Sequence, residues 1–489
     1  MKATDIFKDE KFIECLKNNT FDEKGNHIKI FNDKDEIIEE NIDKVAYIKC
    51  FRFWITNING ISIFKNLKKL DLSYNRIKKL PKEIGNLKNL KILDLEGNEL
   101  QHLPKEILKL ENLEELNLSS NKIKKLPEEI ENLRNLKILN LNYNKIKEIP
   151  KEICKLKNLK ELNLFHNQLK EIPEEIGKLV NLEKLDLTNN KLQKIPKEIF
   201  QLKKLKVLNL WSNKIEVISK EINKLINLKE LDLSFNQIKE IPKEIGILIN
   251  LEILDLSYNE IKELSKEIGK LINLKELILW NNKLQYLPSE IGNLKNLKKL
   301  NLSDNKIEII PKEIKNLNNL RWLNLSNNQI KKIPKEICNL KNLEILDLTW
   351  NQLQWLPEEI WNLKNLKILN LNFNQIKEIP NEICNLKNLK VLDLSFNQLQ
   401  WLPIEILKLD KLEYIWLKEA FDLDNLKQDP EELRDILKKL KWKKVYSDGG
   451  LTYFRKKVYP VLEKQIKEKY RIDDLKKFKD NLNFDNFNF

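Results

Sequence analysis

A 23-residue repeat recurs fifteen times between Leu67 and Lys411 without insertion or deletion, so its first leucine returns in unbroken register as far as Leu389. Self-similarity at a fixed period of roughly 20–50 residues indicates a solenoid, in which each repeat buries its apolar face only against its neighbours. A stack of this kind presents a long surface rather than a central cleft. The pattern therefore favours recognition of a partner over catalysis.

Each repeat combines two kinds of apolar spacing, as in LEELNLSSNKIKKLPEEIENLRN from Leu113 to Asn135. Counted from the first leucine, positions 4 and 6 alternate with polar residues, as on a short strand with one buried face. Positions 14, 18, 21 and the next position 1 step by four, three and three, which is helical spacing. One repeat is therefore predicted to be a strand followed by a short helix or 3-10 turn, and the fold to be α/β.

Three polar or breaking columns agree with this unit. Proline stands at position 15 in thirteen of fifteen repeats, where a helix start does not need its missing N–H, and serine replaces it at Ser219 and Ser265. Glutamate at position 17 falls in the first turn, where the helix dipole favours negative charge. Asparagine occupies position 9 in every repeat. Its amide is predicted to bond backbone groups that a tight bend would otherwise leave unpaired.

The consensus LxxLxLxxNxL followed by LPxEIxxLxN resembles the leucine-rich repeat family, in the 23-residue subtype of Scribble- and Erbin-like proteins, plant Ras-group proteins and many bacterial proteins. The resemblance spans residues 67–411. It implies a curved horseshoe with a parallel sheet on the concave side and short helices or 3-10 turns on the convex side. It names no ligand, because this fold serves many.

The flanks are expected to cap the two ends of the repeats, since terminal repeats would otherwise expose their cores. Residues 1–66 form the N-terminal flank with a degenerate first repeat. Within it, Thr4–Asn19 is predicted to be one amphipathic helix and Val45–Ile55 a strand. The polar stretch with Asn32, Asp33, Asp35 and Glu36 is interpreted as an exposed acidic helix start rather than a calcium loop, because the loop glycine is missing.

Residues 412–489 are interpreted as a last partial repeat, a capping helix and a basic extension. The box Asp429–Glu432 opens the helix, whose apolar residues lie on one face: Leu433, Ile436, Leu437 and Leu440. A Gly449–Gly450 turn and a second helix near Pro460–Tyr470 are predicted beyond it.

Cysteine usage and the N-terminus predict a cytosolic protein. No run of 18 uncharged apolar residues is present, and the first residues lack the apolar core of a signal peptide. A disulfide between Cys15 and Cys50 is therefore not favoured, although both lie in the N-terminal flank. Neither the cysteines nor the three histidines are spaced as a metal cluster, so no metal or other cofactor is expected.

No catalytic motif accompanies the repeats, and the chain is predicted not to be an enzyme. A GxxxxGK[ST] loop is absent, no cysteine follows Cys384, and no histidine follows His166. Seven aspartates stand at position 5 of the repeats, where pairing across strands accounts for them without an active site.

The net charge of +14 comes mainly from the repeats, which hold 59 basic and 47 acidic residues. Glutamates interrupt the lysines nearly everywhere, so a solvated mixed-charge surface is favoured. An RNA or other polyanion platform is the alternative function from a different class.

Departures from the consensus on the concave strands predict the partner site. Solvent-facing positions 3, 5, 7 and 8 carry aromatic residues in the later repeats, namely Trp211, Phe235, Tyr258, Trp280, Trp322, Trp350, Phe373 and Phe396. Ile278 is the one position-5 residue that is neither Asp nor Asn, and Asp255, Asn324 and Asp347 would orient the partner. The predicted function is a scaffold that binds another protein here, with signalling as one setting and Trp280, Trp322 and Trp350 at the centre. The competing interpretation is that rings at position 8 merely cover the turn below them.

A second departure lies on the convex side. Position 22, usually lysine or another polar residue, is isoleucine in repeats seven to nine (Ile226, Ile249 and Ile272), with Ile247 nearby. These residues either tuck against neighbouring turns or form a contact patch for a weak dimer.

Overall fold

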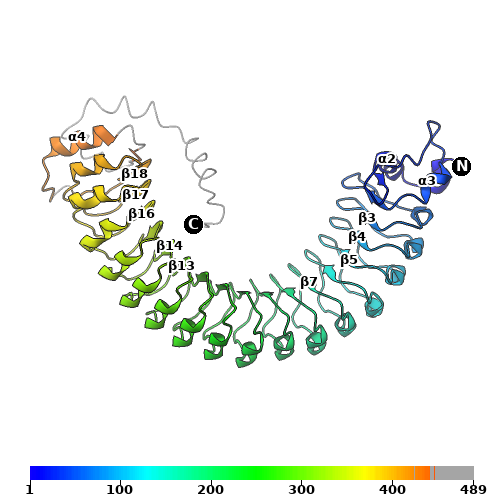
Figure 1. Cartoon of the computed structure of the whole chain (residues 1–489), viewed down its shortest axis with the longest axis horizontal. Coiled ribbons are helices and arrows are strands. Elements are labelled where there is room, and N and C mark those ends of the chain that lie inside the picture. Colours follow the sequence, from blue (N-terminus) through cyan, green and yellow to red (C-terminus); the bar gives the residue numbers. More distant parts are fainter. Residues whose placement is uncertain (423–424, 441–444, 447–489) are drawn as a thin grey trace. The chain divides into compact units, whose positions relative to one another are not determined.

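The computed structural model describes residues 1–422, 425–440 and 445–446. The chain divides into an N-terminal body, Met1–Gln329, and a C-terminal body, Ile330–Phe489. Each body is a stack of repeats, and in each the strands line the inner side of the stack while the 3-10 turns line the outer side (Figure 1).

In the N-terminal body, each repeat contributes one three-residue strand at positions 3 to 5. Each strand pairs in parallel with the next, without a register shift, so equal positions lie side by side, as Leu231 does beside Leu254. The strands are β3 (Lys69–Asp71), β4 (Ile92–Asp94), β5 (Glu115–Asn117), β6 (Ile138–Asn140), β7 (Glu161–Asn163), β8 (Lys184–Asp186), β9 (Val207–Asn209), β10 (Glu230–Asp232), β11 (Ile253–Asp255), β12 (Glu276–Ile278), β13 (Lys299–Asn301) and β14 (Trp322–Asn324).

Positions 16 to 20 of these repeats form a 3-10 turn, from η2 (Lys82–Asn86) to η12 (Lys312–Asn316). The sequence left open whether this element is a helix or a 3-10 turn, and the tighter form is the one adopted. Apolar residues at positions 1, 4, 6, 11, 14, 18 and 21 point between strand and turn and are almost completely buried. This continuous core confirms the predicted leucine-rich repeat solenoid.

The position-9 asparagines form a buried ladder through the stack. The amide of Asn236 donates to the carbonyls of Leu210, Leu233 and Ser234, each at 3.0 Å, and its Oδ1 accepts from the Ile215 N–H at 3.0 Å. The same bonds recur along the repeats. One side chain thus satisfies backbone groups of two neighbouring repeats, as the sequence predicted.

The two repeats that lack proline at position 15 use serine as a helix cap. Ser219 accepts a hydrogen bond from the Glu221 N–H before η8 (Lys220–Lys224), and Ser265 accepts from the Glu267 N–H before η10 (Lys266–Lys270). Serine is among the preferred N-cap residues because its hydroxyl pairs with an N–H that the turn leaves free. The substitution therefore preserves the start of the turn.

The N-terminal flank closes the first end of the core, but with more breaks than its sequence predicts. Its elements are α1 (Ala3–Ile6), α2 (Glu10–Asn18), β1 (Thr20–Phe21), α3 (Glu39–Ile42), β2 (Tyr47–Lys49) and η1 (Ile61–Ile63). The single helix predicted over Thr4–Asn19 is wrong, because the backbone becomes extended at Phe7 and Asp9 then caps α2 through the Lys11 and Phe12 N–H groups. The strand predicted over Val45–Ile55 is limited to β2. The ring of Phe7 stacks on that of Phe64, with ring centroids 6.2 Å apart, and so packs the cap against the degenerate repeat.

Cys15 and Cys50 are joined by a disulfide, contrary to the sequence interpretation. Their Cα atoms lie 5.6 Å apart, and both residues are fully buried where α2 meets the end of β2. The sequence argument relied on compartment alone and had no means of seeing that the fold brings α2 against β2.

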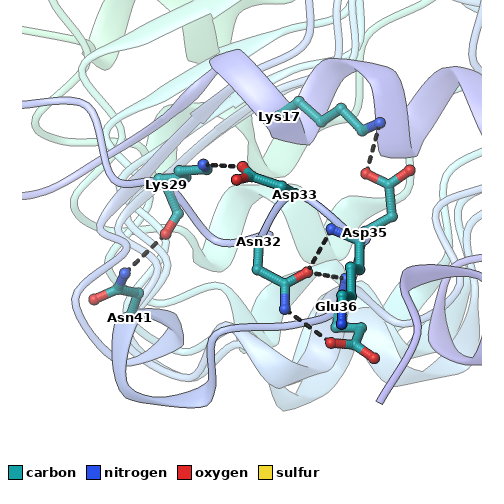
Figure 2. A network of polar contacts seen from close by, with 8 residues as sticks. Lys17, Lys29, Asn32, Asp33, Asp35, Glu36 and Asn41 are labelled. Atoms are coloured by element: carbon teal, nitrogen blue, oxygen red, sulfur yellow. Dashed lines mark hydrogen bonds and ion pairs between the residues drawn. The ribbon is translucent and has the colours of Figure 1, made fainter.

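The acidic stretch after β1 is a tight loop and not the helix start that was predicted. The side-chain Oδ1 of Asn32 accepts hydrogen bonds from the backbone N–H groups of Lys34 and Glu36, both at 2.9 Å, and Figure 2 shows Asn32 and Glu36 facing each other in this loop. Asp33 pairs with Lys29 and Asp35 pairs with Lys17, each at 2.8 Å. Lysines of the same flank therefore neutralise Asp33 and Asp35, whereas Glu36 accepts from the Asn32 amide at 2.8 Å.

The C-terminal body continues the repeat pattern and ends in a helix. It contains β15 (Ile345–Asp347), β16 (Ile368–Asn370), β17 (Val391–Asp393), β18 (Tyr414–Trp416), β19 (Val445–Tyr446), the 3-10 turns η13 (Lys335–Asn339) to η16 (Ile404–Lys408), and α4 (Pro430–Leu440). As predicted, α4 is capped by Asp429, which accepts from the Glu432 N–H at 3.1 Å. Leu433, Ile436 and Leu440 are buried, and α4 packs against η16.

The turn predicted at Gly449–Gly450 and the helix near Pro460–Tyr470 lie outside the described residues. Within the part of the chain that the structure describes, no helix is both long and apolar enough to span a lipid bilayer.

Candidate functional site

Position 8 of the repeats holds the backbone in the left-handed region, next to the concave strands. Phe235 has φ of 54°, Tyr258 49°, Trp350 52°, Phe373 49° and Phe396 51°. A bulky residue in this region is strained, and such strain persists where surrounding structure enforces it. In the sequence, Gly97 and the asparagines at position 8 of other repeats already indicated a left-handed backbone at this position. The rings are thus projected from fixed, identical backbone sites.

In the N-terminal body, four of the predicted aromatic residues form one continuous row of rings. Phe235 stacks on Tyr258 at 3.9 Å, and Tyr258 meets Trp280 edge-on at 4.2 Å. Trp211 contacts the edge of Phe235 at 5.7 Å. All four remain partly exposed, and we call them the ring row. The contacts between rings support the interpretation that the aromatic residues mainly cover the turns below them. Because the rings are also partly exposed, the ring row remains available to a partner.

A row of carboxylates runs beside the ring row at position 5. Asp232 and Asp255 are direct neighbours on β10 and β11, flanked by Asn209 on β9 and Ile278 on β12. Among the described residues, each aspartate accepts hydrogen bonds through Oδ1 alone, from the N–H of Ser234 or Ser257 at 2.9 Å and from the same residue's hydroxyl. Burial, followed by repulsion from Asp232, raises the pKa of Asp255 to about 6. Burial also raises the pKa of Asp232.

Glu230, which the sequence analysis did not single out, belongs to the same group. It stands on β10 two residues before Asp232, and burial together with the charge of Asp232 raises its pKa. Among the described residues, none forms an ion pair or hydrogen bond with its carboxylate. In the sequence it resembles the glutamates that stand at position 3 of other repeats, Glu115, Glu161 and Glu276. We call Glu230, Asp232 and Asp255, together with the ring row, the acid–ring patch.

The N-terminal end of the concave face has the same ingredients but a different outcome. The guanidinium of Arg52 lies 5.0 Å from the ring centre of Phe51 and 5.1 Å from that of Tyr74. The Tyr74 hydroxyl donates to Glu96 at 2.7 Å. Here the chain supplies its own cation to the rings.

The remaining predicted concave residues do not all suit the role assigned to them. Trp350, Phe373 and Phe396 form a second stack in the C-terminal body, with centroids 4.0 and 4.1 Å apart, and Trp350 is 54% exposed. Asp347 is only 4% exposed and bonds Thr349 and Asn370, so the prediction that it orients a partner is wrong. Trp322 carries Lys299 Nζ 4.7 Å from its ring centre. Asn324 is partly buried and accepts from the Ser326 N–H.

Lysines at the edges of the repeats pair with glutamates of a neighbouring repeat. Lys137 pairs with Glu114 at 2.5 Å and Lys206 with Glu183 at 2.6 Å. A shallow hollow of about 400 Å³ lies on this edge, lined by Glu183, Lys204, Lys206, Asn227, Lys229 and Asn250. Alternating ion pairs of this kind favour the solvated-surface interpretation over a polyanion platform.

On the outer side, the isoleucine column is open to solvent rather than tucked against neighbouring turns. Ile226 is 50% exposed, Ile249 49% and Ile272 53%. Ile247, the last residue of η9 (Lys243–Ile247), is 49% exposed. Val180, also at position 22, is 52% exposed and was missed because repeat six interrupts the column with Lys203.

Family comparisons agree with the repeat geometry. Models of the leucine-rich repeat region match residues 153–218, 207–307 and 304–375, those of the leucine rich repeat match 65–123 and 111–169, and a two-copy model matches 364–404. The chain belongs to the leucine-rich repeat family. No curated protein sequence matches it.

Solved structures extend this assignment. A leucine-rich repeat protein of Leptospira interrogans is 44% identical, with a TM-score of 0.66, over 72% of this chain and 97% of that one. A TDR receptor is 27% identical, with a TM-score of 0.67, over 77% of this chain and 73% of that one. The Arabidopsis receptor kinase HAESA, solved with the peptide hormone IDA and the co-receptor SERK1, is 25% identical, with a TM-score of 0.55, over 79% and 85%. Leucine-rich repeat domains of this kind generally mediate protein–protein interaction.

Proposed function

We propose that this chain is a non-catalytic binding protein that recognises another protein through its concave face. The observation that carries this function is the ring row of Trp211, Phe235, Tyr258 and Trp280, held partly exposed on neighbouring repeats. Aromatic side chains dominate interface energetics because they offer a large contact area with little entropy to lose. The regular stack beneath them is rigid, so these rings are already organised before binding.

The relatives support this proposal without identifying the partner. HAESA is a receptor that was solved with a peptide hormone, and the bound peptide belongs to that protein. A signalling role for this chain is part of the proposal. The cytosolic location stays a prediction, and the Cys15–Cys50 disulfide weighs against it because disulfides are rare in reducing compartments.

The test compares three single variants of the full chain in capture of proteins from a lysate. Replacement of a true anchor, Trp280→Ala or Trp350→Ala, should cost about 2 kcal/mol or more of binding free energy. The matched control is Lys283→Ala, which removes an exposed lysine paired with Glu260 at 2.9 Å, and it should cost less than about 1 kcal/mol. Circular dichroism checks that each variant folds. Equal small losses in all three would contradict a concave site.

A nuclease arm separates protein recognition from the polyanion alternative. If the lysines bound RNA, capture would fall steeply with salt in proportion to the phosphates contacted. We expect captured proteins to persist after nuclease treatment. Submicromolar, salt-steep binding to mixed RNA would instead assign the chain to the alternative class.

A further inference from the structure

In the concave middle of the N-terminal body, no described lysine or arginine lies over the rings, although the charges of Lys184 and Lys299 oppose the rise in the pKa of Glu230 and Asp255, respectively. At the N-terminal end of the concave face, Arg52 stands over Phe51 and Tyr74. Lys299 stands over Trp322. Over the ring row, by contrast, no described lysine or arginine takes a comparable position. The rings of the acid–ring patch are therefore the part of this face left without a positive partner.

The three carboxylates of the acid–ring patch offer only acceptors, next to the ring N–H groups of Trp211 and Trp280 and the Tyr258 hydroxyl. Asp232 and Asp255 use one carboxylate oxygen each for Ser234 and Ser257, and their other oxygens accept no recorded bond from the described residues. Glu230 is likewise unpaired there. Asn209, the strand neighbour of Asp232, has a fully buried Oδ1 without a donor. Acceptors grouped in this way are complementary to a ligand that brings N–H donors and positive charge.

The apolar surroundings narrow the choice of cation. Ile278 closes the carboxylate row on one side, and Val207 and Ile253 lie at position 3 of β9 and β11. A small hydrated ion would gain nothing from rings and isoleucines. A lysine or arginine side chain has an aliphatic stem that packs on apolar surface and a charged end that pairs with carboxylates.

We infer that the acid–ring patch binds a lysine or arginine side chain of a partner protein, with its charge beside Glu230, Asp232 and Asp255 and its stem against the ring row. This inference rests on the proposed concave binding function and specifies the chemistry of the partner. The partner's charge would pair with partly buried carboxylates, and charge-assisted hydrogen bonds of this kind are about twice as strong as neutral ones. Arg52, which lies over the rings of Phe51 and Tyr74, forms a contact of the same kind within the chain.

The probe is a phage library of random dodecapeptides selected on the full chain. We expect enriched peptides to share a lysine or arginine beside apolar residues. Their binding, measured by calorimetry with synthetic peptide, should weaken about tenfold or more in Asp232→Asn/Asp255→Asn. Asparagine keeps the Oδ1 that accepts from Ser234 and Ser257, so the strands should be preserved.

The matched control is Asp71→Asn/Asp94→Asn, which changes the same repeat position on the neighbouring strands β3 and β4. It removes the same charge and should alter binding less than about twofold. Replacing the peptide's arginine by citrulline, which has the same shape without charge, should weaken binding to wild type. It should have no further effect on Asp232→Asn/Asp255→Asn, because interacting groups are not additive.

The outcomes separate this inference from the proposed function. Peptides that lose affinity in Trp211→Ala/Trp280→Ala but not in Asp232→Asn/Asp255→Asn would overturn the cation site while leaving concave binding intact. Enriched peptides that are neutral or acidic would do the same. Failure to enrich any peptide, or peptides insensitive to both double variants, would overturn the site and the concave function together.

Discussion

The N-terminal cap and the concave middle of the N-terminal body treat buried carboxylates in opposite ways. Asp9 in the cap accepts from Lys11 and Phe12 through one oxygen and from Thr56 and Asn57 through the other. Burial alone would raise the pKa of Asp9, but the hydrogen bonds from Thr56, Asn57 and Phe12 lower it below its ordinary value. In the concave middle, burial prevails and the pKa of Asp255 rises to about 6.

This difference distinguishes carboxylates that stabilise the fold from carboxylates that are available to a ligand at the surface. A carboxylate that is fully bonded in its charged form stabilises the structure around it. A carboxylate that is partly buried next to another charge is held at a cost, because the rest of the repeat fixes its position. The buried carboxylate of the cap therefore stabilises the cap, whereas the carboxylates of the acid–ring patch are destabilising and are held in place by the stability of the surrounding repeats.

The largest effect is expected from the disulfide in the cap. Cys15 and Cys50 close a loop with a sequence separation of 35, and loss of such a link costs roughly 3–4 kcal/mol in the chain-entropy model. We expect Cys15→Ser/Cys50→Ser, or reduction, to accelerate hydrogen exchange in α2 and β2 and to leave β9–β12 unchanged. The measurement is exchange resolved by peptide mass spectrometry. Unchanged exchange in the cap would show that the link contributes nothing there.

The second effect is a loss of stability in Asp9→Asn. An amide cannot accept at both ends, so N–H groups of either the α2 start or Thr56 and Asn57 lose their acceptor. The expected cost is about 2–3 kcal/mol, measured by urea unfolding at neutral pH. Because the folded pKa is lowered, wild type should lose this advantage as pH falls through the acid range of that carboxyl. If the variant is as stable as wild type at pH 7, the charged Asp9 carboxylate does not stabilise the cap.

The third effect has the opposite sign and belongs to Asp255→Asn. The folded state of wild type binds a proton more tightly than the unfolded state, so its stability falls as pH rises from about 4 to about 6. Above that window the variant should be more stable by at most on the order of 2–3 kcal/mol, and the two proteins should converge below it. Asp304→Asn, at a partly exposed position 8 of the same face, controls for general charge removal, since asparagine keeps the oxygen that accepts from Asn327. Equal stability of wild type and Asp255→Asn at all pH values would show that the ionised Asp255 carboxylate does not destabilise the fold.

The repeat made most of the fold predictable, whereas the caps resisted prediction. Leucine spacing fixes which side chain is buried in every repeat, and the position-9 asparagine and position-15 proline fix its two bends. In the cap no column repeats, so the apolar pattern runs on through a break in which Phe7 is extended and Asp9 caps a new helix. The contact of Cys15 with Cys50 depends on tertiary packing of α2 and could not be read from spacing.

The candidate site was predictable in its aromatic part and not in its electrostatic part. Phe235, Tyr258 and Trp280 stand out from the consensus, and strand register places them together. Glu230 and Asp255 look like ordinary members of polar columns in the sequence. Their importance comes from partial burial and from missing partners, which are properties of the assembled sheet. Asp347 shows the reverse, since an identical column position proved to be buried and satisfied.

The smallest expected effect concerns the outer side of the same region. Ile226, Ile249 and Ile272 stand in consecutive repeats, each about half exposed, where lysine is the most common residue. Exposed apolar columns of this kind favour self-association, and a two-fold arrangement would bury the same column of both copies. The hypothesis is a weak dimer, with a dissociation constant on the order of 10–100 μM, corresponding to about 5.5–7 kcal/mol.

Sedimentation velocity of wild type and of the triple variant Ile226→Lys/Ile249→Lys/Ile272→Lys decides this last point. We expect a concentration-dependent sedimentation coefficient in wild type alone, because lysine repels its copy across the axis and restores the charge found in neighbouring repeats. Val180→Lys, at the same position but separated from the column by Lys203, serves as the single-site control. If wild type and the triple variant both sediment as monomers at every concentration, the exposed column is not a dimer interface. The departures in repeats seven to nine would then concern the concave side only.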